Sequence, residues 1–144
     1  MSIRVTAVAA TAVLLSLTAG AASAAMLNVT TTLKGSDEVP PNTTTGKGAV
    51  EATLDTTTKA FAYKVTYSGL TGTATAAHFH GPAAPGSNAP PVITMKVLAS
   101  PITGTETLTD AQIADLRAGK WYFNVHTAAH PGGEIRGQLK VTPQ

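Results

Sequence analysis

Hydrophobic and polar residues alternate with a period of two along most of the chain that follows the first 25 residues. In residues 48–54, Val50 and Leu54 fall on one face of an extended chain and Glu51 on the other, and residues 61–67 repeat this alternation. A period of two places one face of a strand on a core and the other in water. The pattern therefore predicts an antiparallel β-sheet with one buried face.

Turn residues divide the alternating segments into about seven or eight short strands, which is typical of an all-β Greek-key sandwich or barrel. The expected strands span residues 27–33, 48–54, 61–67, 73–80, 92–98, 105–108, 121–126 and 133–142, with loops at 35–47 and 81–91. One short helix is expected near 109–118. There, Thr109 and Gln112 fit a capping box and Gly119 can end the helix.

The first 24 residues have a different character. Arg4 precedes an uncharged apolar run over residues 5–22, and Ala22-Ser23-Ala24 supplies small residues where a signal peptidase cleaves. This order is the secretory signature, and the run is short for an uncleaved membrane anchor. We therefore expect a signal peptide over 1–24, one β domain over 25–144, export to the periplasm or medium, and no membrane span after cleavage.

The composition of the chain excludes several classes of function. The chain has no cysteine, so neither disulfides nor thiolate ligands are available. The loss of Arg4 leaves a net charge of about +1 with scattered bases, which argues against a nucleic-acid partner. The sequence contains no nucleophile motif and no phosphate-binding loop, and its acidic residues are dispersed. We assign no catalytic residue and favour a protein that is not an enzyme.

The four histidines form two groups, His78-x-His80 and the pair His126 and His130. Residues i and i+2 of a strand point the same way, so His78 and His80 should project together, and His126 ends another predicted strand. Neutral imidazole is a common ligand of copper and zinc. We expect a metal site of His78, His80 and His126, with His130 as a candidate fourth ligand. The alternative is that these are structural histidines hydrogen-bonded to backbone.

Four further polar residues are candidates for supporting this site. Asn124 shares the His126 face of its strand and could fix the tautomer of an imidazole, as could Tyr122. Glu38 could order its loop by pairing with Arg136, or could simply be exposed. Glu134 and Arg136 share a strand face, and for both a structural ion pair with neighbouring residues is favoured over a catalytic role.

Four phrases occur in order along the chain: EVPP at 38–41, AAHFHGPA at 76–83, WYFNVHT at 121–127 and GGEIRGQL at 132–139. Together they resemble the CHRD domain family, named after the domain repeated in chordin, over about residues 27–141. A signal peptide followed by one such domain is similar to many bacterial exported proteins. The resemblance implies no established enzymatic activity.

A weaker resemblance links the chain to copper/zinc superoxide dismutases, whose fold is an eight-stranded Greek-key barrel. It implies that His78 and His80 correspond to a copper-binding pair, His126 to a later copper ligand and Arg136 to an anion-guiding arginine. The chain departs from that family because it lacks cysteine, because loop 81–91 has neither histidine nor aspartate, and because the bridging histidine has no clear counterpart.

From these observations we expect an exported, non-catalytic metal-binding module that takes copper in preference to zinc. Two alternatives remain open at this point. The first is a structural or protein-interaction module whose histidines are incidental. The second is a copper oxidoreductase resembling superoxide dismutase, although the missing zinc loop argues against it.

Overall fold

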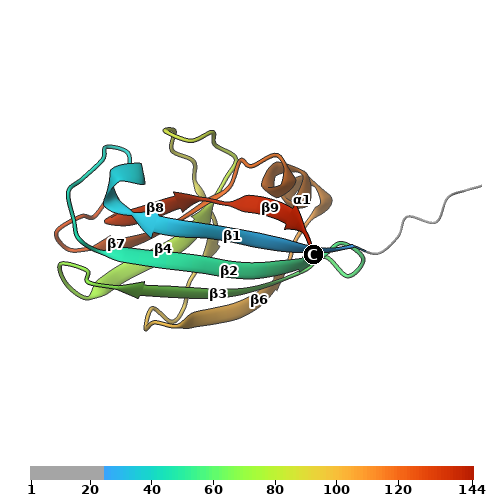
Figure 1. Ribbon diagram of the computed structural model, residues 1–144, viewed down its shortest axis with the longest axis horizontal. Coiled ribbons are helices and arrows are strands. Elements are labelled where there is room, and N and C mark those ends of the chain that lie inside the picture. The colour runs from blue at the N-terminus through green and yellow to red at the C-terminus, as the bar shows by residue number, and fades with distance from the viewer. Residues whose placement is uncertain (1–24) are drawn as a thin grey trace, which may run out of the picture.

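A computed structural model describes residues 25–144, so the predicted signal peptide lies outside the described residues. The described chain forms nine strands, a 3-10 helix and one α-helix (Figure 1). In chain order these are β1 (Met26–Lys34), η1 (Gly35–Asp37), β2 (Lys47–Asp55), β3 (Ala60–Ser68), β4 (Ala74–His80), β5 (Pro91–Thr94), β6 (Ile102–Thr107), α1 (Asp110–Arg117), β7 (Tyr122–Thr127), β8 (Ile135–Gln138) and β9 (Lys140–Pro143).

The strands form one antiparallel sheet in the order β5-β4-β7-β8-β1-β2-β3-β6, with β9 also paired to β1. Three pairs of neighbours in this order are not consecutive in the chain, namely β3 with β6, β4 with β7 and β1 with β8, so the connections cross over. These crossovers are characteristic of a Greek-key arrangement. The expected all-β fold is therefore confirmed.

The sheet curls so that its two halves face each other across the core, and β4 and β7 lie behind β1 and β2 in Figure 1. β3 and β4 are not neighbours in the sheet, yet the rings of Phe61 and Phe79 meet edge to face with centroids 5.3 Å apart. The ring centroids of Phe79 and Phe123 lie 4.7 Å apart, and those of Trp121 and Phe61 lie 6.2 Å apart. Aromatic burial of this kind drives the closure of the two halves.

The alternation along the strands correctly predicts which face of β2 and β3 is buried. Val50 and Leu54 of β2 and Val65 of β3 are fully buried, while Glu51 and Lys64 between them are exposed. The helix begins with the expected capping box: the Thr109 hydroxyl accepts from the backbone of Gln112, and the Gln112 side chain accepts from the backbone of Thr109.

Two expected strands need correction. Residues 133–142 form two strands. β8 pairs with β7 and with β1, whereas β9 pairs with β1 alone, and the Leu139 backbone N–H between them donates to Trp121 O. The strand expected over 92–98 is β5, which ends at Thr94: the Met95 N–H still donates to Ala77 O of β4, but the chain bends at Lys96 and residues 95–98 form no strand.

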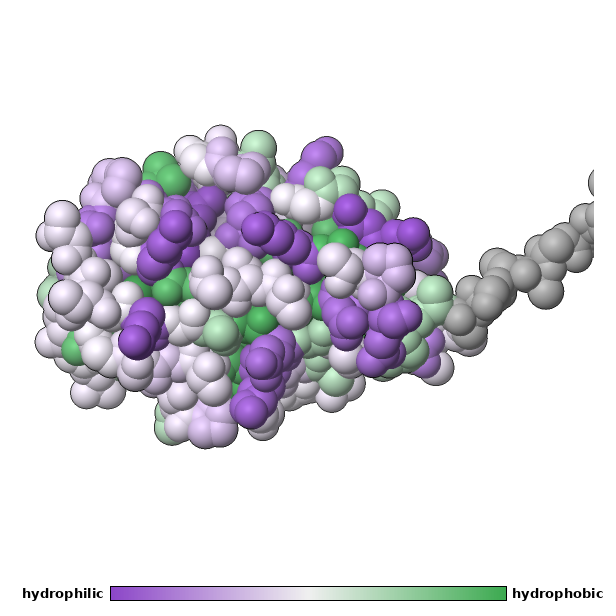
Figure 2. All heavy atoms as spheres, viewed as in Figure 1, coloured by the Kyte–Doolittle hydropathy of each residue, from purple (hydrophilic) through white to green (hydrophobic). Residues whose placement is uncertain are grey.

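The outer surface of β1, β2 and β3 is mostly polar. Figure 2 shows hydrophilic side chains scattered over this face and no continuous hydrophobic patch. Among the described residues, the exposed large hydrophobic side chains are Met26 and Val97. No helix within residues 25–144 is long and apolar enough to cross a membrane.

Candidate metal centre

The candidate residues lie on the outer face of three neighbouring strands, β4, β7 and β8. Phe79 of β4 points into the core, so His78 and His80 on either side of it point outward, as expected. The strand register places His80 beside Tyr122 and His78 beside Asn124. The same register continues into β8, where Arg136 lies beside Asn124.

This part of the outer face is covered by the loop between β4 and β5. The carbonyl oxygen of Ala89 in that loop lies 2.8 Å from His80 Nδ1, and the Tyr122 hydroxyl donates to the same carbonyl at 3.2 Å. The Ala89 N–H donates in turn to the Tyr122 hydroxyl. The loop thus buries His80 and Tyr122, which an uncovered sheet would leave exposed.

Three imidazoles converge here. One nitrogen from each of His78, His80 and His126 lies within 4.8 Å of the other two. Two of these nitrogens are in direct contact, since His78 Nδ1 lies 3.2 Å from His126 Nε2. Two nitrogens that bind one ion at about 2.0–2.1 Å lie about 3.3 Å apart in a tetrahedral site. The His78 and His126 nitrogens already have that spacing.

Backbone carbonyls fix which nitrogen of two of these rings can bind a metal. A carbonyl oxygen can only accept, so His80 Nδ1 donates its hydrogen to Ala89 O and His126 Nδ1 donates to Pro131 O at 2.9 Å. A neutral imidazole carries one ring hydrogen, so Nε2 of both rings carries the lone pair, and in His126 this lone pair faces His78 Nδ1 at 3.2 Å. Partners of this kind orient histidine ligands in metal sites.

The surroundings also favour the neutral imidazoles that a metal needs. Burial lowers the pKa of His78 below its ordinary value, and the neighbouring His126 and His80 lower it further. Burial is likewise the main cause that lowers the pKa of His80. At neutral pH both rings are therefore uncharged and able to act as ligands.

His130 is not brought into this cluster. Among the described residues, the group whose nitrogens converge consists of His78, His80 and His126. The backbone of His130 closes the tight turn after β7, exchanging hydrogen bonds with Thr127 and accepting one from Gly133. Its position in the turn separates it from the outward-facing strand residues.

Asn124 contacts the cluster directly. Its side-chain amide oxygen lies 2.9 Å from His80 Nε2, the nitrogen with the free lone pair. His80 Nε2 carries no hydrogen and can only accept a hydrogen bond. The Asn124 side-chain amide is therefore rotated by a half turn, so that its NH₂ group faces this nitrogen and donates to it. Asn124 thus contacts the histidine cluster, as expected. The groups that fix the tautomers of His80 and His126, however, are the carbonyls of Ala89 and Pro131.

Arg136, Tyr122 and His80 form a stack. The Arg136 guanidinium carbon lies 3.5 Å from the centroid of the Tyr122 ring, and the Tyr122 and His80 rings are parallel within 5° with centroids 4.6 Å apart. Arg136 is only 2% exposed, and it donates to the side-chain oxygen of Asn88 at 2.8 Å and to Ser87 O. The stack therefore fixes the plane of the His80 ring.

Among the described residues Arg136 forms no ion pair, neither with Glu38, a pairing that the sequence left open, nor with another neighbour. The ion pairs among the described residues are Lys34 with Asp37 and Lys59 with Asp110. The guanidinium of Arg136 is directed instead to neutral oxygens in loop 81–91, and its face lies on Tyr122. Its charge still acts at a distance, since it lowers the pKa of Glu38.

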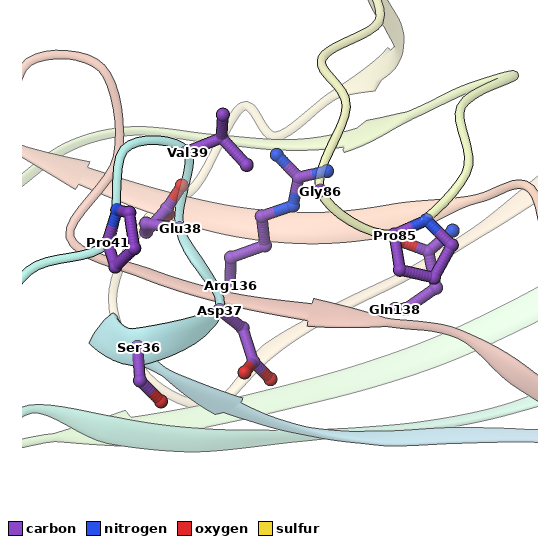
Figure 3. Close-up of a pocket in the computed structure, with 9 residues that line it drawn as sticks. All are labelled: Ser36, Asp37, Glu38, Val39, Pro41, Pro85, Gly86, Arg136 and Gln138. Carbon is purple, nitrogen blue, oxygen red and sulfur yellow. The ribbon is translucent and has the colours of Figure 1, made fainter.

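Glu38 is buried beside this site rather than exposed. Burial outweighs the effect of Arg136 and raises the Glu38 pKa from 4.5 to about 7, while a hydrogen bond with the Asn124 side chain lowers it. The Glu38 side chain is 3% exposed, and its Oε1 has no hydrogen-bond partner among the described residues. Glu38 and Arg136 also line a hollow of about 460 Å³ between loops 36–41 and 85–86 (Figure 3).

Glu134 anchors the loops around the site. Its carboxylate accepts hydrogen bonds from three threonine hydroxyls and one backbone N–H, which come from Thr44, Thr71 and Thr127. Burial alone would raise its pKa, but these donors outweigh burial and lower the pKa to about 2. Its partners are thus hydroxyls and an amide, whereas the sequence suggested an ion pair with a neighbouring residue.

Comparison with known protein families matches the CHRD domain over residues 29–139, which is most of the described chain. The chain belongs to the CHRD domain family. The comparisons with curated proteins and with solved structures give no match, so the weaker resemblance to superoxide dismutases stays a prediction. In this CHRD domain the matched segment includes all three converging histidines.

The backbone groups of the site could not be found from sequence. A carbonyl oxygen is present at every residue, so nothing in the sequence distinguishes Ala89 or Pro131 from its neighbours. The stacking of Arg136 on Tyr122 has a partial signal, because both residues belong to alternating strands whose outward faces were correctly predicted.

Proposed function

We propose that this CHRD domain is an exported, non-catalytic metal-binding protein that takes one copper ion, in preference to zinc, through His78, His80 and His126. The observation that carries the proposal is the convergence of three imidazole nitrogens within 4.8 Å on one outer face of the sheet. A divalent ion would be held by His78 Nδ1 and by the Nε2 atoms of His80 and His126.

The chemistry of the donors supports copper. All three donors are neutral nitrogens, and for such a set the affinity of divalent first-row metals reaches its maximum at copper(II) and falls at zinc. No thiolate is available to reverse this order, since the chain has no cysteine. Export is supported by the secretory pattern of the first 24 residues.

The surroundings are those of a binding site more than of a reactive one. The His80 ring is fixed by Ala89 O on one edge and by Tyr122 on one face, and loop 81–91 covers it. Glu38, the carboxylate within residues 25–144 whose pKa is strongly raised, lies beside Asn124 and is not one of the three converging ligands. We therefore assign metal binding and no turnover.

The test compares single alanine variants in isothermal titration with copper(II) at pH 7.5. His80→Ala and His126→Ala should each abolish stoichiometric binding, because either change removes one of three ligands. His130→Ala is the matched control, since it removes a histidine from the adjoining turn, and it should bind like the wild type. Equal affinities in all four proteins would refute the proposed site.

A further inference from the structure

The nitrogen that His80 would offer to a metal is engaged by another side chain. His80 Nδ1 is held by Ala89 O, so Nε2 is the ligand nitrogen, and the Asn124 side-chain amide lies 2.9 Å from it. One lone pair cannot serve the amide and a metal ion together. Binding of a metal at His80 therefore requires the amide of Asn124 to leave.

A second acceptor lies next to that amide. The Asn124 amide also lies beside the Glu38 side chain, between the carboxyl group and the imidazole, and its NH₂ group can face only one of them. Glu38 is buried, and its Oε1 has no hydrogen-bond partner among residues 25–144. A buried acceptor without a partner is costly, and a donor released nearby would relieve that cost.

We propose that Asn124 gates the metal centre: its amide holds His80 Nε2 until a metal takes that nitrogen, and it then turns to Glu38 Oε1. The inference rests on the proposed function, because it concerns how the same three-histidine site is filled. The gate sets the affinity of the site, since each binding event exchanges the His80–Asn124 hydrogen bond for one to Glu38.

The first test is copper(II) titration of the wild type, Asn124→Ala and Asn28→Ala. Without the competing amide, Asn124→Ala should bind copper about three- to tenfold more tightly, which is the equilibrium equivalent of one net hydrogen bond. Asn28→Ala is the matched control, because it removes an amide from β1, opposite Thr53 of β2 and outside the metal site. Unchanged or weaker binding by Asn124→Ala would overturn the gate.

A second measurement keeps the wild-type side chains in place. Zinc(II) is diamagnetic, so the side-chain NH₂ signals of Asn124 can be followed by NMR through a zinc titration of the ¹⁵N-labelled protein. They should shift in step with zinc occupancy because the amide changes partner, whereas those of Asn28 on β1 should stay in place. Asn124 signals that do not shift on saturation would contradict the proposal.

Glu38→Met tests the receiving acceptor. It should weaken copper binding in the wild-type background, because the released amide then has no partner, and it should have no effect in the Asn124→Ala background. Equal effects in both backgrounds would overturn the gate. A wild type that binds copper together with an Asn124→Ala variant that binds no more tightly refutes the gate alone, whereas a lack of binding by both refutes the proposed function as well.

Discussion

Replacement of Glu134 by glutamine should destabilise the protein strongly, although it changes only one atom of a side chain. The carboxylate is fully buried, and it accepts from the hydroxyls of Thr44 and Thr127 at 2.6 Å each. It also accepts from the hydroxyl of Thr71 at 2.8 Å and from its N–H at 2.9 Å. Glutamine removes the charge and replaces one acceptor oxygen with an NH₂ group.

Two arguments give a similar magnitude for this loss. The difference between the ordinary pKa of 4.5 and the Glu134 pKa of about 2 corresponds to about 3 kcal/mol of stability at neutral pH. Independently, hydrogen bonds to charged groups exceed neutral ones by about 1 kcal/mol each, and four such bonds are weakened. Glu134→Gln should therefore lower the free energy of unfolding by about 3 kcal/mol at pH 7.

The pH dependence has a definite sign. Because the folded-state pKa is lowered, the stabilisation by Glu134 is fully present above pH 4.5 and is lost as the pH falls from 4.5 towards 2. The wild type should lose this contribution over that interval, and Glu134→Gln should not. The stability difference between the two proteins should thus shrink as the pH approaches 2.

Urea unfolding followed by the fluorescence of Trp121, the single tryptophan of the chain, measures both quantities. Glu51→Gln is the control, because Glu51 is exposed on β2 opposite Lys64, and its effect should stay within about 0.5 kcal/mol. A loss below about 1 kcal/mol for Glu134→Gln, or a difference that does not change down to pH 2, would refute this account of the anchor.

Three further predictions concern Gly81, Tyr122 and the helix cap at Thr109. Gly81→Ala should destabilise the protein by about 1–3 kcal/mol in urea unfolding, because a Cβ there would lie 2.4 Å from the Trp121 ring. An unchanged free energy of unfolding would show that the ring can move aside. Tyr122→Leu should weaken copper binding more than Tyr122→Phe in titration calorimetry, because phenylalanine keeps the stack on His80; equal losses would contradict a role for stacking. Thr109→Ala should cost about 1 kcal/mol by thermal melting through loss of the helix cap, and an unchanged melting point would contradict this.

The strands were predictable because one physical signal dominates them. Residues such as Val50, Leu54 and Phe123 alternate with polar neighbours, and the structure buries each of them. The helix was predictable for the same reason, since Thr109 and Gln112 form its capping box locally. The division of residues 133–142 into two strands was not, because it depends on tertiary pairing: β8 lies between β7 and β1, whereas β9 pairs with β1 alone.

The three-histidine cluster could be anticipated because strand geometry alone directs His78 and His80 to the same side. The partners of Glu38, Glu134 and Arg136 could not be anticipated, since they come from loops whose paths have no periodic signal. Charge suggested ion pairs, but the folded chain gives Glu134 hydroxyl donors and gives Arg136 neutral oxygens and the Tyr122 ring.

The most direct test of the central claim is a calorimetric titration of the chelator-treated protein with copper(II) and zinc(II), at pH 7.5 and at pH 5.5. The account predicts one site per chain that binds copper more tightly than zinc and weakens at pH 5.5, where protons compete for the imidazoles. Weak binding at several sites, with no change between the two pH values, would contradict the claim that His78, His80 and His126 form a metal centre.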